Sequence, residues 1–353
     1  MLDTLLACLS RPRRLALALT CAASLASAEP FTIVDEGGYE ATFDAPVTRI
    51  VTLQRYNVEF ARAIAGAEVI VGLDRSTWKD RAYWPELDES TVVAASQFDI
   101  DYERVVAQEP DLLLVARNGA WQEAREKLAP FGIPVVVLTG WDVLRHEENI
   151  TLLGQLTGKP ERAEAFNAFY RKHMDLLAER ISDDIERPKV YFEAERENVT
   201  VLNGSGWHDM IAVAGGQSLF GDVDVAALPE SSRNVNIYVV EPEAVAAANP
   251  DIVLRLTPAI IGPVPGEKAE DLVRSIKARP ALMDSNAVRD NQVFLMSYHM
   301  AGGVSKMIGA LQLAKWLHPD RFEDVDPEAV MREWIEDWQG QSYPGPQSFV
   351  AQP

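Results

Sequence analysis

The sequence predicts an α/β protein of two lobes, each built on a central parallel sheet, with one long α-helix between them. Three observations carry this prediction. Short apolar runs alternate with helical patterns from residue 49 to residue 138, one long helical stripe follows, and the alternation resumes after Pro188. The chain has 353 residues, about the length of two domains. Hydrophobic residues make up 47% of it, enough for a core in each lobe.

The N-terminal half starts with a hairpin pattern, because apolar runs at 31–35 and 40–43 flank the turn residues Gly37 and Gly38. Short apolar runs of strand length follow at 49–53, 69–73, 112–115 and 134–138. Helical patterns lie between them at 57–65, 102–107 and 121–128. This order is typical of a parallel sheet covered by helices.

The pattern changes at Pro160, after which no glycine or further proline occurs up to Ser182. Apolar residues three or four positions apart form one stripe here: Ala163, Phe166, Tyr170, Met174, Leu177 and Ile181. A helix of about 23 residues is roughly 34 Å long, which suits a strut between lobes. We predict a linking helix at 160–183, an N-terminal lobe at 29–159 and a C-terminal lobe at 184–353.

The C-terminal half repeats the alternation. Strands are predicted at 189–193, 252–256 and 292–296, and helices at 207–214, 241–248, 270–277, 303–317 and 327–338. Two Rossmann-like lobes of this kind bind a ligand in the cleft between them, where the carboxyl ends of their strands meet.

The first 28 residues have the pattern of an export signal. Arg11, Arg13 and Arg14 form a basic region, residues 15–25 are apolar, and Ala26-Ser27-Ala28 supplies small residues for cleavage after Ala28. The apolar run is too short to span a bilayer, and no later segment is apolar enough. We therefore expect a protein of the periplasm. Two alternatives stay open, lipidation at Cys21 and twin-arginine export through Arg13-Arg14.

Charge and cysteine content exclude several function classes. The net charge is −20, and it becomes −22 once Asp3 and three arginines leave with the signal. Nucleic acid is not an expected partner, because phosphate contacts need a basic face. Both cysteines, Cys8 and Cys21, lie in the signal, so the mature chain is predicted to hold no disulfide, thiolate metal site or cysteine nucleophile.

One segment occurs in both halves. Glu103 stands seven residues before Pro110-Asp111, which opens the strand at 112–115, and Glu243 stands seven residues before Pro250-Asp251, which opens the strand at 252–256. The match at corresponding points of two α/β halves indicates two lobes of the same design.

Four features together resemble a known family: residues 33–37 with 46–51, the two Pro-Asp segments, residues 214–216 after a helix, and residues 310–319. The chain resembles the periplasmic substrate-binding proteins of ABC importers, in the class whose lobes are joined by one long helix. Within that class it is similar to the iron-complex branch. Members of the class capture ferric siderophores, haem, cobalamin or molybdate.

The resemblance implies a monomeric binding protein, without cofactor or catalysis, that captures an iron complex and delivers it to an inner-membrane ABC permease. The expected ligand is a ferric siderophore or similar chelate. Molybdate or tungstate, or cobalamin, is the alternative within the class. The resemblance also implies that Glu103 and Glu243 dock onto permease arginines. The other interpretation is that both acids stabilise the N-termini of their own helices.

Residues just past each predicted strand are the candidates for ligand contact. Arginine, tryptophan and tyrosine recur at these points, a mixture that suits a large anionic or aromatic chelate. The candidates are Arg55, Tyr56, Trp78, Arg117, Trp121, Trp141, Trp207, Arg255, Tyr298 and His299. Alternatives stay open: Arg255 would pair with a buried acid if it lies inside its strand, and each tryptophan would be ordinary core.

Signals for a bare metal ion or for catalysis are scarce. The five histidines are scattered singly, whereas a site for a naked divalent ion needs several converging ligands. Tyr298 and His299 are the candidates for reaching a ferric centre directly. The usual catalytic and phosphate-binding motifs are absent from the sequence. A hydrolase built on Ser205, His208 and Asp209 is the remote alternative, but consecutive positions at a helix start point to different faces.

Overall fold

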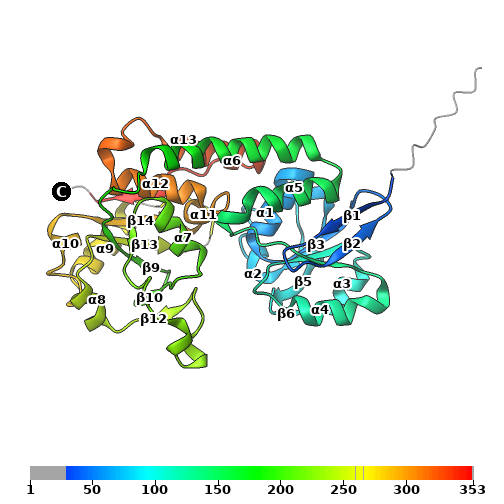
Figure 1. The fold of residues 1–353 in the computed structure, drawn as a ribbon, viewed down its shortest axis with the longest axis horizontal. Coiled ribbons are helices and arrows are strands. Elements are labelled where there is room, and N and C mark those ends of the chain that lie inside the picture. The colour runs from blue at the N-terminus through cyan, green and yellow to red at the C-terminus, as the bar shows by residue number, and fades with distance from the viewer. Residues whose placement is uncertain (1–28, 259, 265, 352–353) are drawn as a thin grey trace, which may run out of the picture.

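A computed structural model describes residues 29–258, 260–264 and 266–351, and in it two α/β lobes lie side by side (Figure 1). Helix α6 (Pro160–Arg180) runs along both lobes and covers most of the predicted linking segment. The predicted export signal, residues 1–28, lies outside the described residues. Within the described ranges, every helix is too short or too polar to cross a bilayer.

The N-terminal lobe opens with the predicted hairpin, β1 (Phe31–Val34) and β2 (Glu40–Phe43). Its sheet has the strand order β6-β5-β4-β3-β7-β8, and all neighbours are parallel except β5 and β6. The strands are β3 (Ile50–Thr52), β4 (Ile70–Asp74), β5 (Val92–Ser96), β6 (Asp99–Ile100), β7 (Leu112–Val115) and β8 (Val135–Val137).

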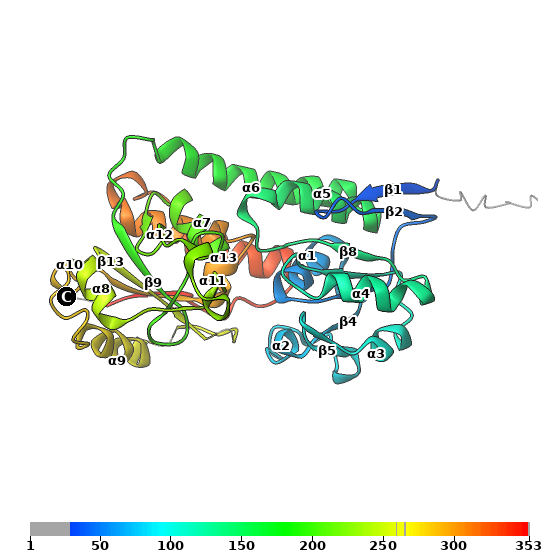
Figure 2. The same cartoon turned by 60° about the horizontal axis from the view of Figure 1, so that its bottom comes forward.

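Helices cover both faces of this sheet because its strands are apolar on both sides. Ile50 packs in the core beneath α1 and α5, while the next residue, Val51, packs with Val105 of α3 and Leu128 of α4. Figure 2 shows α5 beside α6, away from α3 and α4. The helices are α1 (Arg55–Ala65), α2 (Arg75–Trp78), α3 (Tyr102–Ala107), α4 (Trp121–Leu128) and α5 (His146–Thr157).

The C-terminal lobe has the sheet order β11-β9-β13-β14-β15, parallel except for β15, and a separate antiparallel pair, β10 with β12. The strands are β9 (Lys189–Glu193), β10 (Val199–Thr200), β11 (Gln217–Ser218), β12 (Tyr238–Val239), β13 (Ile252–Thr257), β14 (Val293–Ser297) and β15 (Ser348–Val350). The helices are α7 (Gly206–Val213), α8 (Pro242–Ala248), α9 (Gly266–Lys277), α10 (Asn286–Arg289), α11 (Tyr298–Gly302), α12 (Met307–Leu317) and α13 (Pro327–Glu333).

The segment that occurs in both halves makes the same corner in both lobes. The Asp111 carboxylate accepts hydrogen bonds from the backbone N–H groups of Thr48 and Arg49, at 2.7 and 2.9 Å, just before β3. The Asp251 carboxylate accepts one from the backbone N–H of Lys189, at 2.9 Å, at the start of β9. Each Pro-Asp therefore fixes the start of its own strand against the start of the neighbouring one.

A single apolar core continues from one lobe into the other. Phe166 of α6 contacts Phe60 of α1, with ring centroids 5.6 Å apart, and stacks on Trp334 at 5.5 Å. Trp334 begins η8 (Trp334–Trp338), a turn of π-helix that continues α13 and returns to the N-terminal lobe. There Arg62 Nε donates to Gln339 Oε1 at 2.9 Å. The lobes are thus joined by α6 and by this returning segment.

Two helix predictions are wrong in part. The predicted helix at 303–317 begins only at Met307, because Val304, Ser305 and Lys306 adopt left-handed backbone angles, with φ of 47°, 49° and 68°. The predicted helix at 327–338 changes from α to π geometry at Trp334. Helix α5 and the strands β5 and β6 had not been predicted.

Candidate functional site

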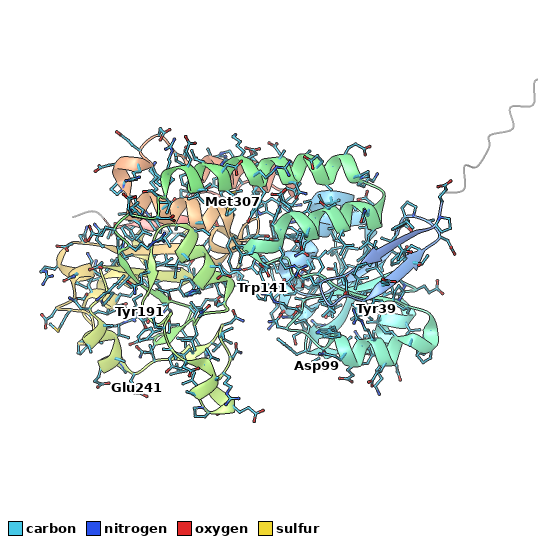
Figure 3. All side chains as sticks on the ribbon, viewed as in Figure 1. Tyr39, Asp99, Trp141, Tyr191, Glu241 and Met307 are labelled. Atoms are coloured by element: carbon cyan, nitrogen blue, oxygen red, sulfur yellow. The ribbon has the colours of Figure 1, made fainter. Side chains whose placement is uncertain are left out.

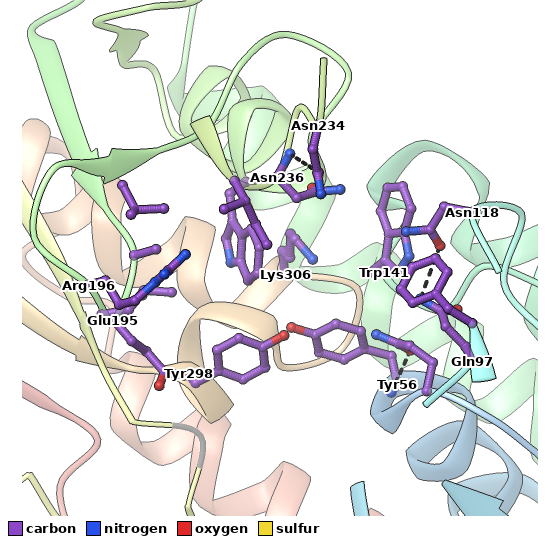
Figure 4. Close-up of a pocket in the computed structure, with 18 residues that line it drawn as sticks. Tyr56, Gln97, Asn118, Trp141, Glu195, Arg196, Asn234, Asn236, Tyr298 and Lys306 are labelled. Atoms are coloured by element: carbon purple, nitrogen blue, oxygen red, sulfur yellow. Dashed lines mark hydrogen bonds between the residues drawn. The ribbon is translucent and has the colours of Figure 1, made fainter. Parts of the chain in front are cut away.

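A cavity of about 440 Å³ lies between the two lobes (Figure 4). Its N-terminal wall comes from loops and helix starts that follow β3, β5, β7 and β8. Its C-terminal wall comes from strands β10 and β13 and from segments that follow β9, β10, β11 and β14. The lining is mainly apolar and aromatic with polar groups around it: Gln54, Tyr56, Gln97, Phe98, Asn118, Trp141, Ala194, Glu195, Arg196, Val199, Gly206, Trp207, Asn234, Asn236, Ile237, Leu256, Tyr298 and Lys306.

Aromatic rings from both lobes meet in this cavity. The rings of Tyr56 and Tyr298 are nearly parallel, with centroids 6.1 Å apart, and their hydroxyl groups face each other across the lobes (Figure 4). Trp207 stands edge-on to Tyr298 at 5.6 Å. Burial raises the pKa of both tyrosine hydroxyls, so they are neutral hydrogen-bonding groups at ordinary pH. Trp141 lies between the lobes as well (Figure 3).

Tyr56 is held in place by the start of α1. The side chain of Gln54 accepts a hydrogen bond from the Tyr56 N–H at 2.9 Å, and the Gln54 N–H donates to Asp74 at 2.7 Å. Across the lobes, Gly302 allows the ring to come close, because a Cβ atom there would lie 2.4 Å from the Tyr56 hydroxyl oxygen. The absence of a side chain at position 302 therefore permits the contact between lobes.

Polar groups surround the aromatic part of the cavity. Gln97 Nε2 donates to Asn118 Oδ1 at 3.4 Å on the N-terminal wall. Asn234 and Asn236 face them from the C-terminal lobe, in the segment between β11 and β12. Side-chain amides both donate and accept hydrogen bonds. These walls can therefore contact ligand hydroxyl groups as well as ligand oxygens that only accept.

Lys306 was not a sequence candidate, yet it lies at the inner end of the cavity and is 2% exposed. Its Nζ is 4.7 Å from the ring centroid of Tyr56, 4.8 Å from that of Trp207 and 5.8 Å from that of Trp141. Burial lowers its pKa to about 7. The only signal in the sequence was a lysine inside an otherwise apolar helical pattern, three positions after Gly303.

The structure brings four of the ten predicted ligand residues to the cavity: Tyr56, Trp141, Trp207 and Tyr298. The other six lie outside its lining.

Arg55 and His299 form a buried cluster with Asp80 that joins the lobes. His299 Nε2 lies 2.9 Å from Asp80 Oδ2 and 2.7 Å from Arg55 Nη1, and Arg55 Nη2 lies 3.3 Å from the same carboxylate oxygen. Burial lowers the pKa of His299 to about 4, so the ring is neutral at ordinary pH. Neither side chain lines the cavity. Within the described ranges, no three His, Cys, Asp or Glu side chains converge on one point that would suit a metal ion.

Arg255 pairs with a buried acid, as the alternative interpretation stated. Its Nη1 lies 2.6 Å from Glu193 Oε2, inside the C-terminal sheet. Trp78 is buried in the N-terminal lobe, 7% exposed.

Arg117 and Trp121 lie behind the cavity wall. The Arg117 guanidinium stacks at 4.5 Å from the Trp141 ring centroid and pairs with Asp142, so it supports a lining residue. Trp121 Nε1 donates to the Arg117 carbonyl oxygen at 3.1 Å.

The remote hydrolase candidates are arranged as a helix start. Ser205 is fully buried, and its Oγ accepts a hydrogen bond from the Trp207 N–H at 3.3 Å as the cap of α7. The described residues show no hydrogen bond between Ser205 and His208.

Glu103 and Glu243 are both exposed. They occupy the first turns of α3 and α8, on the side of each lobe away from α6 (Figure 1).

A family model described as periplasmic binding protein matches residues 50–298, more than half of the chain. This chain belongs to that family. The vitamin B12-binding protein of Vibrio campbellii is 23% identical over 183 residues, which cover 51% of this chain and 64% of that protein, less than two thirds of its length. The family match confirms the predicted resemblance to periplasmic binding proteins, and the iron-complex branch stays a prediction.

Solved structures of other periplasmic binding proteins share the fold. The TroA-like protein FepB from Veillonella parvula superposes with a TM-score of 0.76 at 23% identity, covering 91% of this chain and 99% of that one. The molybdate-bound MolA of Haemophilus influenzae superposes with a TM-score of 0.69 at 20% identity, covering 89% and 99%. These likenesses confirm the predicted two-lobed fold.

Proposed function

We propose that this chain is the substrate-binding component of an ABC importer, which captures an iron complex in the cleft between its lobes and delivers it to an inner-membrane permease. The proposed solute is a ferric siderophore or a similar chelate, and no covalent chemistry occurs. Family membership supports the binding role, and the aromatic cavity between the lobes supports the class of solute.

The cavity is the observation that carries this proposal. Its volume of about 440 Å³ lies within the range of about 300–1,000 Å³ that organic ligands occupy. Flat faces of Tyr56, Trp141 and Trp207 suit the planar or conjugated parts of a chelator. A tetrahedral oxyanion such as molybdate has five heavy atoms and gains little from aromatic walls, so we regard it as the weaker alternative.

Cobalamin is the second candidate. The similarity to proteins named vitamin B12-binding favours it, and a corrin ring also suits aromatic and amide walls. A direct comparison of ligands distinguishes the two.

The test is tryptophan fluorescence of the mature protein, titrated with ferric siderophores, ferric citrate, haem, cobalamin and molybdate. We expect saturable quenching at submicromolar concentration by one iron complex, because Trp141 and Trp207 line the cavity. Trp141→Phe should remove much of that signal, whereas the matched control Trp121→Phe should retain it. Quenching by cobalamin or molybdate alone would identify that compound as the solute in place of an iron complex. Absence of quenching by every ligand would contradict the proposal.

Delivery is tested separately. The double variant Glu103→Ala, Glu243→Ala should leave solute affinity unchanged and abolish uptake in cells, since both acids are exposed on helices remote from the cavity lining. The control variant Glu126→Ala, Glu270→Ala removes two exposed acids from α4 and α9 and should import normally. Loss of affinity in the first variant would mean that these residues act on the ligand instead.

A further inference from the structure

We propose that Lys306 is the anion-recognition residue of the cleft, and that the solute presents a carboxylate, catecholate or other oxyanion to it at the inner end of the cavity. This inference rests on the proposed function and narrows its substrate class to anionic chelates.

The first argument is a buried cation without a direct partner. Lys306 is 2% exposed, and its ammonium group is surrounded by the rings of Tyr56, Trp141 and Trp207. Within the described ranges, its ammonium group forms no hydrogen bond or ion pair with another residue. Buried lysines are normally paired, because removing an ammonium group from water is costly. Since Lys306 lines the cavity, an anionic ligand group is the partner that this arrangement lacks.

The second argument is that the backbone is strained where it delivers this side chain. Val304, Ser305 and Lys306 all have positive φ angles, which L-residues other than glycine adopt at an energetic cost. Such strain persists where the surroundings enforce it, and it concentrates at functional sites. Here Ser305 Oγ donates to the Gly140 carbonyl oxygen at 3.0 Å and lies 2.9 Å from His146 Nδ1, both in the N-terminal lobe. The strained turn is therefore fixed across the lobes.

The third argument is the space left for the lysine stem. A Cβ atom at Gly206 would lie 2.8 Å from Lys306 Cε and 2.8 Å from the Trp141 carbonyl oxygen. Glycine at the start of α7 thus makes room for Lys306 to reach the cavity. Burial, strain and this space together describe a built site.

The charges around Lys306 decide how it responds to pH. Asp209 on α7, Asp142 after β8 and Glu59 on α1 act on the ammonium from a distance, and Arg117 pairs with Asp142. At the cavity mouth stand Glu195 and Arg196, both exposed. Burial outweighs the three acids and lowers the pKa of Lys306 to about 7. An anion bound beside Lys306 restores the charged form, so binding above pH 7 takes up a proton.

The experiment compares anionic and neutral probes by isothermal titration calorimetry at pH 6.5 and pH 8.5. The anionic probes are a ferric tris-catecholate and ferric citrate, and the neutral probes are a ferric tris-hydroxamate and cyanocobalamin. We expect the intact protein to bind an anionic probe, more weakly at pH 8.5. Lys306→Met should weaken that binding at least tenfold and remove its pH dependence. The control Lys172→Met, an exposed lysine on α6, should change neither.

A second readout needs no variant. At pH 8, anion binding should take up close to one proton, measured from the dependence of the binding heat on the ionisation heat of the buffer. Equal affinity of Lys306→Met and the intact protein for an anionic probe, absence of proton uptake, or binding of neutral probes alone would overturn the inference and leave the receptor function standing. Failure of every probe would overturn both.

Discussion

The two lobes share one plan but use their buried charges differently. In the C-terminal lobe, Glu193 is fully buried and accepts from Arg255 at 2.6 Å, from Arg279 at 2.7 Å and from the Asn198 N–H at 2.9 Å, all in the same lobe. Among the buried acids of the N-terminal lobe, Asp80 is the one in contact with both Arg55 and His299.

Asp80 reaches across the lobes. Besides Arg55, it contacts His299 at 2.9 Å and accepts from the Ile261 N–H at 3.0 Å, and both of these residues belong to the C-terminal lobe. One cluster therefore fixes a lobe internally, and the other fixes the two lobes to each other. The two lobes therefore share their mainly parallel sheets and their Pro-Asp corners, whereas their buried charged clusters make different contacts.

Breaking the internal cluster should have the largest effect. Glu193→Ala leaves the buried Arg255 and the partly buried Arg279 without their carboxylate, and we expect the free energy of unfolding to fall by about 3–5 kcal/mol. Urea denaturation measures it. Glu197→Ala is the matched control, because it removes an exposed partner of Arg279, 3.6 Å away, and should cost less than about 1 kcal/mol. Equal losses in the two variants would mean that the buried cluster adds nothing to stability.

Acidification should destabilise the protein through the Arg55–Asp80–His299 cluster that joins the lobes. Burial, followed by the charge of Arg55, lowers the pKa of His299 from 6.5 to about 4. Between these pH values the unfolded chain binds more protons than the folded one. The contribution of the neutral His299 ring to stability is therefore complete above pH 6.5 and is lost as pH falls towards 4. We expect His299 to lower the free energy of unfolding by on the order of 2 kcal/mol between pH 7 and pH 4.5.

The measurement is denaturation of the intact protein and of His299→Gln at both pH values. The variant should lose less stability on acidification. His146 and His173, whose pKa values burial also lowers, titrate in both proteins and so act as an internal control. An identical loss in the two proteins would assign the acid response to other groups.

Substitutions at the Pro-Asp corners, which occur in both lobes, should have the smallest effects on stability, and the two effects should be similar. Asp111→Ala and Asp251→Ala each remove a carboxylate that accepts backbone hydrogen bonds at the start of a neighbouring strand. We expect each to lower the free energy of unfolding by about 1–2 kcal/mol. Urea midpoints compare them directly. Losses that differ by more than about 1 kcal/mol would show that the two corners are equivalent in shape only.

Much of the fold was predictable because its signals are local. Helices α3 and α4 have the predicted bounds, since apolar periodicity and turn residues delimit them. Long-range constraints were not predictable. Residues 303–306 had a helical pattern, but contacts from Ser305 to Gly140 and His146 impose a left-handed turn instead.

The candidate site shows the same division. Strand ends identified Tyr56, Trp141, Trp207 and Tyr298, because the topology brings such positions to one cleft. The same rule also selected Arg55 and His299. Nothing in the neighbouring sequence indicated that both side chains would instead contact Asp80. Lys306 was missed because its position depends on a turn that the sequence pattern concealed.

The segment that returns from the C-terminal lobe has a consequence for the order in which the protein forms. Gln339 accepts from Arg62 and donates to the Glu59 carbonyl oxygen at 3.0 Å, yet it stands 277 positions after Arg62. At roughly 5–20 residues per second, a ribosome reaches Gln339 roughly 15–55 s after Arg62. Until Gln339 is present, Arg62 Nε and the Glu59 carbonyl oxygen lack these two hydrogen-bond partners. The N-terminal lobe is synthesised first, yet the contacts of its helix α1 are completed only by a residue made long after its own sheet.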